Sequence, residues 1–427
     1  MTQALVSKSY LSVFKRWTNL SGRVAIAQIF IQGVNAITGL VLVRLMAKED
    51  YAWLTVAASL LATLNLLADG GVSTGLTVIG GQLHDQKNRF ARLLTDALGL
   101  SFKLCTFGFL LATPFFWTIF ENVGAPHSIK LGVMVLAVVS SYSAISTALY
   151  GVANRLQKRV QFVQGAEATA AITRLALILG VAGFGHLSVL PTLAATVFSI
   201  WVQGVFIRSN SRDLIDHSQT QTSYGPELKG FIKSLYANHL FFCLQAQFTT
   251  WIISWLAGSG EVADLGALAR LGLLFTAISA PFTQLAIPAV ARIREPRTLR
   301  IRLAIVFVVA VSATVSVICV SWLFPTPFLW LLGDKYRHLS SELPLAIIGQ
   351  GVTMVTGLAW SLALARGWVK RAWMTIFTTS LGFVIAGLIA PLNTVTGVLQ
   401  FNILAIIPTF LYCAIVICMQ TLRTQNP

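Results

Sequence analysis

The sequence has few charged residues, and acidic residues are the scarcer kind. Only 11% of its 427 residues are charged, against about 25% in soluble globular proteins. There are 15 Asp and Glu against 31 Lys and Arg, and 56% of all residues are hydrophobic. This composition excludes a soluble globular domain and predicts an integral membrane protein.

The motifs of several enzyme classes are also missing. The five cysteines lie singly inside apolar runs, without the C-x-x-C or Cys/His spacing of a metal site, so neither a metal nor another cofactor is expected. No Walker lysine loop is present, which argues against ATP hydrolysis by this chain. Residues 71–75 fit the G-x-S-x-G pattern, but they end an apolar run where that motif needs a strand-to-helix turn. We therefore do not expect an enzyme.

Apolar runs of about 20 residues, long enough to cross a bilayer core, recur along the whole chain. Several runs are longer than a straight crossing of the bilayer requires and contain proline, so tilted or kinked helices are expected. The predicted fold class is an all-α integral membrane protein with twelve transmembrane helices. The twelve predicted spans lie near residues 24–46, 52–79, 93–120, 129–152, 163–184, 187–207, 234–257, 262–290, 303–325, 341–365, 372–391 and 396–420.

The basic residues are distributed unequally between the two sides of this topology. One side carries 23 of the 31 Lys and Arg, the other carries 5, and 3 lie inside spans. Because cytoplasmic loops are enriched in Lys and Arg, both termini and the loop at 208–233 are predicted to be cytoplasmic, in the cytoplasmic (inner) membrane. The basic excess is then an orientation signal with some attraction to anionic membrane lipid, and no nucleic-acid partner is expected. Residues 1–23 lack the pattern of a secretory signal, so the first span is expected to be retained.

The chain repeats itself at an offset of 212 or 213 residues. Residues 113–117 (TPFFW) fall on residues 326–330 (TPFLW), and Glu49 falls on Glu261. These matches predict two six-helix bundles, residues 1–207 and 234–427, joined by a linker at 208–233. Six crossings return the chain to the side on which it began, so both bundles enter the membrane with the same orientation. They are therefore expected to be parallel repeats that meet around a central cleft.

Three basic residues fall inside spans, where a charge needs a cavity or a partner. Lys103, Arg174 and Arg270 are predicted near mid-membrane, and together they would suit a diphosphate. The alternative is pairing with acids, since Asp96 and Glu167 each lie seven residues before a cation on the same helix face.

Four further charged residues are candidates for the site or for its charge partners, and three of them have two possible roles. Arg23 and Arg44, near the ends of the first span, either extend to lipid headgroups or join the cationic cavity. Asp69, deep in the second span, is either a protonatable coupling residue or a charge partner. Asp264 is the deepest acid on the helix of Arg270 and is a further candidate partner.

Two segments carry a family resemblance. Residues 44–52 (RLMAKEDYA) and 67–76 (LADGGVSTGL) resemble the start of the polysaccharide-exporter flippases, the O-antigen (Wzx-type) branch of the multidrug, oligosaccharidyl-lipid and polysaccharide (MOP) exporter superfamily. Ala52 stands where that family usually has Gly, whereas residues 261–271 resemble its span-8 signature with Gly266 present. The resemblance implies alternating-access export of a polyprenyl-diphosphate-linked oligosaccharide for O-antigen, capsule or exopolysaccharide assembly. A glycan polymerase and glycosyltransferases would then be partners.

Two other transporter classes compete with this interpretation. A cation-coupled multidrug-type exporter of small amphipathic compounds would need acids in its cavity, whereas this chain has an excess of basic residues at depth. The peptidoglycan-precursor flippase branch usually has fourteen spans, against twelve here. The sequence leaves open whether protons, sodium or the membrane potential drive transport.

Overall fold

The computed structural model describes residues 26–83, 86–157, 159–185, 187–211, 223–256, 258–291, 293, 295–366, 368 and 373–423. Over these residues every regular element is a helix. The first half of the chain forms a helix at Ile26–Leu45, followed by α2 (Lys48–Asp69), α3 (Val72–Leu83), α4 (Lys87–Asn122), α5 (His127–Leu156), α6 (Val160–Gly183) and α7 (Val189–Ser209).

The second half likewise has only helices as regular elements over its described residues. It comprises α8 (Gly225–Leu256), α9 (Ser259–Arg270), α10 (Gly272–Pro281), a π-helical turn η2 (Phe282–Ala286), α11 (Ile287–Ala291), α12 (Pro296–Leu323), α13 (Pro325–Leu332), a 3₁₀ segment η3 (Asp334–Ser340), α14 (Glu342–Ala365), α15 (Trp373–Ile389) and α16 (Val395–Arg423).

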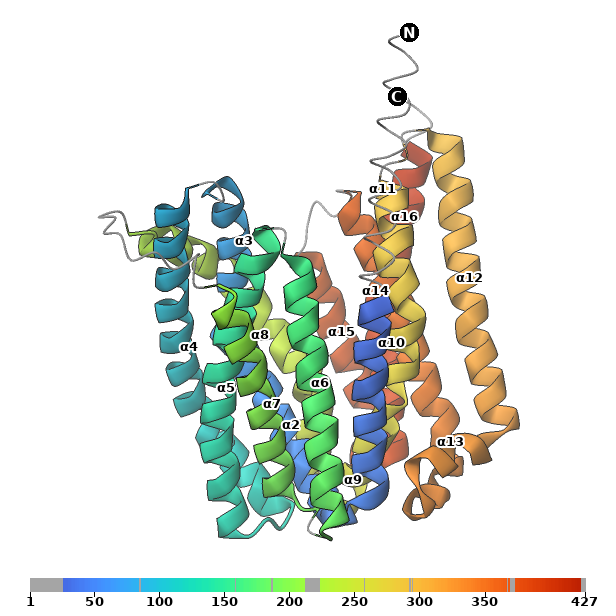
Figure 1. The fold of residues 1–427 in the computed structure, drawn as a ribbon. Coiled ribbons are helices and arrows are strands. Elements are labelled where there is room, and N and C mark those ends of the chain that lie inside the picture. The colour runs from blue at the N-terminus through green and yellow to red at the C-terminus, as the bar shows by residue number, and fades with distance from the viewer. Residues whose placement is uncertain are drawn as a thin grey trace.

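The predicted fold class is confirmed. Among the described residues, ten helices are long and apolar enough to cross a membrane, and α8 and α15 occupy the positions of the remaining two predicted spans. Figure 1 shows the helices running side by side between two faces. We call the face where α2, α5, α7 and α9 begin the lower face, and the face where α4, α6 and α12 begin the upper face.

The second predicted span is two helices, because the chain breaks at two consecutive glycines. Gly70 and Gly71 have φ values of 46° and 96°, which side chains with a Cβ rarely adopt. The Asp69 carboxylate accepts a hydrogen bond from the backbone N–H of Ser73 at 3.1 Å, at the start of α3. Asp69 therefore supports the break and caps the following helix.

The eighth predicted span is also interrupted. It begins with α9, breaks after Arg270, continues as α10 to Pro281, and passes through the π-helical turn into α11. Proline removes a backbone donor from the helical ladder, and such turns are frequent beside it. The break places Arg270 at a helix end inside the membrane.

The linker between the halves differs from its predicted bounds. Helix α7 continues to Ser209, and α8 begins at Gly225, nine residues before the predicted start of its span at 234. Residues 212–222 lie outside the described part of the chain. The described ends of the predicted linker are therefore mostly helical.

The apolar cores show where the halves meet. The largest core draws on the starts of α2, α5 and α7 and on α9, α13 and η3, and so it lies toward the lower face. It includes Met46 and Phe116 from the first half, and Leu268 and Leu332 from the second. Of two smaller cores, one joins α3, α4 and α5 of the first half to the start of α8, and the other lies among α11, α12, α14 and α16 of the second half. The halves thus share a core toward the lower face.

Candidate functional site

Arg270 lies between the two halves and is held by a residue of the first half. Its Nε donates a hydrogen bond to the Tyr51 hydroxyl at 3.1 Å, and that hydroxyl donates to the carbonyl of Gly266 at 3.2 Å. Small residues make room for this arrangement. A Cβ at Gly266 would meet Thr55 and Tyr51, and a Cβ at Gly39 would meet the Arg270 side chain at 3.3 Å.

Arg174, on α6, is held by the first helix. One Nη donates to the Asn35 side-chain oxygen at 2.6 Å. Its Nε is buried and has no hydrogen-bond partner among the described residues. A guanidinium carries five N–H donors, so Arg174 keeps donors for an incoming acceptor.

The two arginines contact the first helix one turn apart. Arg174 donates to Asn35, and the Arg270 side chain lies against Gly39, four residues further along the helix. Arg174 lines a cavity of about 340 Å³, and Arg270 lines a second cavity of about 210 Å³. Gln28 and Gln32 of the first helix line both cavities. Two cations and two neutral amides thus gather on one side of the cleft.

The two arginines also lie at similar depth. Arg174 is nine residues before Gly183, where α6 ends at the lower face, and Arg270 is eleven residues after Ser259, where α9 begins at that face. At 1.5 Å per residue, these positions are about 14 and 16 Å along the helices from that face. The two arginines thus lie at similar depth, and their joint role in one binding site stays a prediction.

Lys103 does not join them. It lies nineteen residues before the end of α4 at the lower face, or about 28 Å along the helix. The side chain is exposed, on the helix side that also exposes Phe107 and Leu110. Lys103 lines neither the cavity of Arg174 nor that of Arg270, so the predicted gathering of three cations is not found at these cavities.

The acids near the predicted site pair with other residues. Glu167 lines the cavity of Arg174 but accepts a hydrogen bond from Arg155 at 2.8 Å. Asp96 pairs with Arg92 at 3.4 Å and accepts from the backbone N–H of Tyr224 at 2.8 Å. Neither acid pairs with the cation seven residues further along its own helix. The predicted pairing of each acid with that cation is therefore not found.

Asp264 and Arg44 both take part in contacts between the halves. Asp264 is buried and pairs with Lys48 at 2.8 Å and with His338 Nε2 at 2.9 Å. The Arg44 guanidinium lies 4.6 Å from the centre of the Trp330 ring, on α13. Neither residue lines the cavities of Arg174 and Arg270. Arg23 lies outside the described residues.

Sequence reasoning missed the polar residues of the first helix. Gln28, Gln32, Asn35 and Gly39 follow one another at spacings of four, three and four residues, which places them on one helix face. This stripe was a readable signal, because a transmembrane helix exposes polar groups to protein or water in preference to lipid. It forms the surface between the two arginines.

No family model matches the sequence, and no curated protein matches it. Solved structures do match. The lipid II flippase MurJ in an inward closed conformation has a TM-score of 0.73 at 15% identity, covering 94% of this chain and 89% of that chain. The inward-facing conformation of a multidrug resistance MATE family transporter of the MOP superfamily has a TM-score of 0.63 at 16% identity, covering 94% and 99%. An outward-facing conformation gives 0.61 at 15%, covering 95% and 96%.

These structural neighbours are MOP superfamily transporters and flippases. At such low identity the similarity shows the fold, in which two lobes of six helices face each other across a central cleft. The chain is thus a multi-pass membrane protein with this two-lobe fold.

Proposed function

We propose that this chain moves a polyprenyl-diphosphate-linked oligosaccharide across the cytoplasmic membrane by alternating access, for assembly of a surface polysaccharide. The observation that carries the proposal is that Arg174 and Arg270 both contact the first helix, one turn apart, beside two cavities that share Gln28 and Gln32. A membrane interior tolerates such charges only against protein, water or a partner, and arginine matches phosphate oxygens with two parallel N–H donors. A diphosphate carries the charge opposite to that of both side chains.

The surrounding charges support an anionic cargo. Glu167 lines the cavity of Arg174 but pairs with Arg155. Asp264, on the helix of Arg270, pairs with Lys48. The two cavities therefore keep an excess of positive charge. An anionic headgroup gains from that field, and a cationic compound is repelled by it.

The lining of the Arg270 cavity suits the lipid part of such a cargo. Ile29 and Leu40 from the first helix face Leu271, Leu274 and other apolar side chains there. An isoprenoid chain gains free energy from such contacts, while its diphosphate reaches Arg270. The Arg270 cavity thus offers apolar contacts for the lipid and a cation for the anionic headgroup.

The alternative is a cation-coupled multidrug-type exporter of small amphipathic compounds. Its support is the fold similarity to the multidrug resistance MATE family transporter. The alternative requires an acid free to attract a cation, whereas the acid that lines the Arg174 cavity, Glu167, pairs with Arg155.

Reconstitution separates the two functions. The purified chain is placed in liposomes with undecaprenyl-diphospho-N-acetylglucosamine that carries a fluorophore on the sugar, and dithionite quenching reports its movement between leaflets. We expect faster movement than in empty liposomes, and loss of that gain in the double variant Arg174→Gln, Arg270→Gln. Arg302→Gln is the matched control, since Arg302 is an exposed arginine of α12. Transport of ethidium, with no movement of the lipid probe, would overturn the proposal in favour of the alternative.

A further inference from the structure

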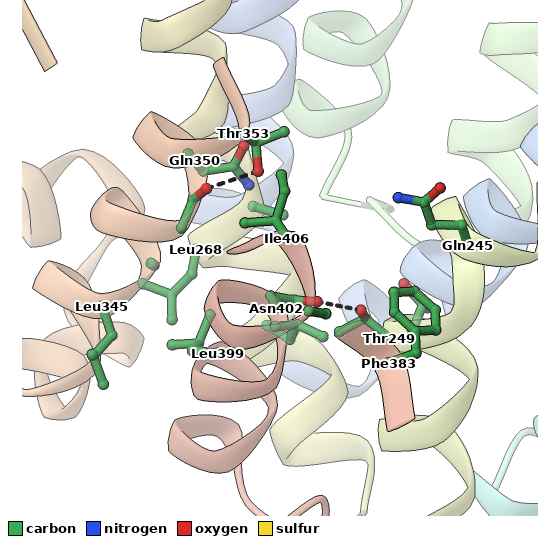
Figure 2. Close-up of a pocket in the computed structure, with 16 residues that line it drawn as sticks. Gln245, Thr249, Leu268, Leu345, Gln350, Thr353, Phe383, Leu399, Asn402 and Ile406 are labelled. Atoms are coloured by element: carbon green, nitrogen blue, oxygen red, sulfur yellow. Dashed lines mark hydrogen bonds between the residues drawn. The ribbon is translucent and has the colours of Figure 1, made fainter. Parts of the chain in front are cut away.

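A third cavity, of about 300 Å³, lies within the second half of the chain. It is formed by α8, α9, α14, α15 and α16, and Figure 2 shows sixteen residues around it. Gln350 and Thr353 of α14 lie on one side and Gln245 and Thr249 of α8 on the other, with Asn402 of α16 between them. The volume is at the small end of the range of small-molecule sites.

This cavity is polar without being charged. None of the sixteen described residues that line it is an acid or a base. Two glutamines, one asparagine and three threonines supply its polar groups, beside apolar side chains such as Leu268 and Phe383. A charged group inside it would leave water without gaining a counter-ion, at a large free-energy cost. A ligand rich in hydroxyl or amide groups meets no such penalty.

Several of these polar groups are positioned to accept or donate. Thr249 donates to the Asn402 side-chain oxygen at 2.6 Å, which leaves the Asn402 amide nitrogen as the donor end. The Gln245 side-chain oxygen is buried and has no hydrogen-bond partner among the described residues. The Gln350 amide lies against Gly272, where a Cβ would meet its oxygen at 2.8 Å. Donors and acceptors therefore surround the space from three helices.

One stretch of chain lines both the neutral cavity and the Arg270 cavity. Ala269 lines the neutral cavity, and the next residue, Arg270, lines the apolar cavity. Gly272, two residues further, lines another cavity of about 320 Å³, to which Gln350 and Thr353 also contribute. The end of α9 and the start of α10 thus form walls of a cavity with a cation and of cavities with neutral polar groups. A diphosphate joined to an uncharged polar group has the chemistry of these linings.

We infer that the neutral cavity is a subsite for the first sugar of the cargo, and that it selects an uncharged sugar bearing hydroxyl or acetamido groups. This inference rests on the proposed function. Arg270 and Arg174 bind the diphosphate, and Gln245, Gln350 and Asn402 bind the sugar next to it. A sugar with a carboxylate loses its hydration there and gains no cation, so the cavity discriminates against it.

Binding of three probes to the purified full-length chain in detergent tests the subsite. The probes are undecaprenyl diphosphate, the same lipid bearing N-acetylglucosamine, and the same lipid bearing glucuronic acid. We expect the N-acetylglucosamine probe to bind about tenfold more tightly than the bare diphosphate, as two or three added hydrogen bonds would give. The glucuronic acid probe should bind no better than the bare diphosphate.

Variants then locate the preference. Gln350→Leu and Asn402→Leu should each remove most of the preference for N-acetylglucosamine while leaving affinity for the bare diphosphate unchanged. Thr353→Val removes a single hydroxyl and provides a milder variant, with thermal unfolding as the check on folding. Gln400→Leu is the matched control, because Gln400 is exposed on α16 and does not line the cavity.

The possible failures are distinguishable. The subsite is overturned, and the proposed function survives, if wild type binds all three probes equally, or if Gln350→Leu and Asn402→Leu both keep the full preference. Tighter binding of the glucuronic acid probe also overturns the subsite. The proposed function itself fails if wild type binds none of the three more tightly than undecaprenol, which has no phosphate.

Discussion

Lys48 and Asp264 join the two halves of the chain near the lower face, with Nζ and Oδ1 2.8 Å apart. Further contacts between the halves gather around this pair. Lys335 donates to the carbonyl of Met46 at 2.5 Å, and Trp251 donates to Ser59 at 3.2 Å. Such contacts must part before the cleft opens at this face. The Lys48–Asp264 pair is therefore expected to bias the protein toward closure there.

The first prediction concerns this pair. Lys48→Asp should favour opening at the lower face, because like charges then face each other. Because Lys48 is partly exposed, solvent weakens the interaction of the two charges. We therefore expect a three- to tenfold change in the ratio of open to closed protein, about 1 kcal/mol. The readout is labelling of Gln32→Cys by an impermeant maleimide added from the lower face, in a chain without its five natural cysteines.

The reversed pair is the control. Adding Asp264→Lys to Lys48→Asp should return labelling most of the way to the wild-type rate, although His338 also contacts Asp264. If Lys48→Asp labels at the wild-type rate, the pair does not hold this face closed.

The second prediction is topological. Glu121 and Asp334 lie at equivalent places in the two halves, at the end of α4 and after α13. From the asymmetry of 23 basic residues against 5, alkaline phosphatase fused after either residue should be active, because the lower face is then outside the cytoplasm. A fusion within residues 212–222 should be inactive. The opposite pattern would reverse the assignment of sides.

Much of the fold could be predicted because its signals are local. Each span is an apolar run, so its existence is written in consecutive residues, and predicted ends such as 129–152 lie close to α5 at His127–Leu156. Breaks were harder to predict. The turn at Gly70 and Gly71 ends one helix and starts another within a continuous apolar run, and hydropathy does not register it. The short helix α13 and η3, between two spans, also escaped prediction.

The candidate site was predictable only where charge itself was the signal. Arg174 and Arg270 stand out because a cation inside a span is costly. Their partners come from distant segments, Asn35 and Tyr51, which spacing along one helix cannot identify. For the same reason Glu167 pairs with Arg155, although Arg174 shares its helix face.

The third prediction concerns the contact of α15 with α16. A Cβ at Gly382 would overlap the backbone carbonyl of Ala405, whereas a Cβ at Gly387 meets nothing within 4 Å. Gly382→Ala should therefore force the helices apart and destabilise the fold by about 1–3 kcal/mol. Gly387→Ala should be neutral or slightly stabilising, since alanine favours a helix over glycine. Thermal unfolding in detergent measures both, and equal midpoints for the two variants would contradict this packing.

The fourth prediction separates a cargo-binding Arg270 from a structural one. Arg270→Ala and Arg270→Glu should each abolish surface glycan export, at nearly unchanged abundance in the membrane, because the site loses a cation that binds the diphosphate. Arg270→Lys should retain part of the activity, since the charge remains while the planar fork is lost. Export is measured as surface glycan in cells, and abundance by immunoblot of membranes.

A purely structural role for Arg270 predicts a different pattern. Its hydrogen bond to Tyr51 would then be the important contact, so Tyr51→Phe should match Arg270→Ala, and both should lower abundance. If Arg270 binds cargo, Tyr51→Phe keeps the cation and should cost only part of the export, at normal abundance. Normal abundance together with normal export in the Arg270→Glu variant would exclude Arg270 from cargo binding, because a carboxylate at this position would repel a diphosphate.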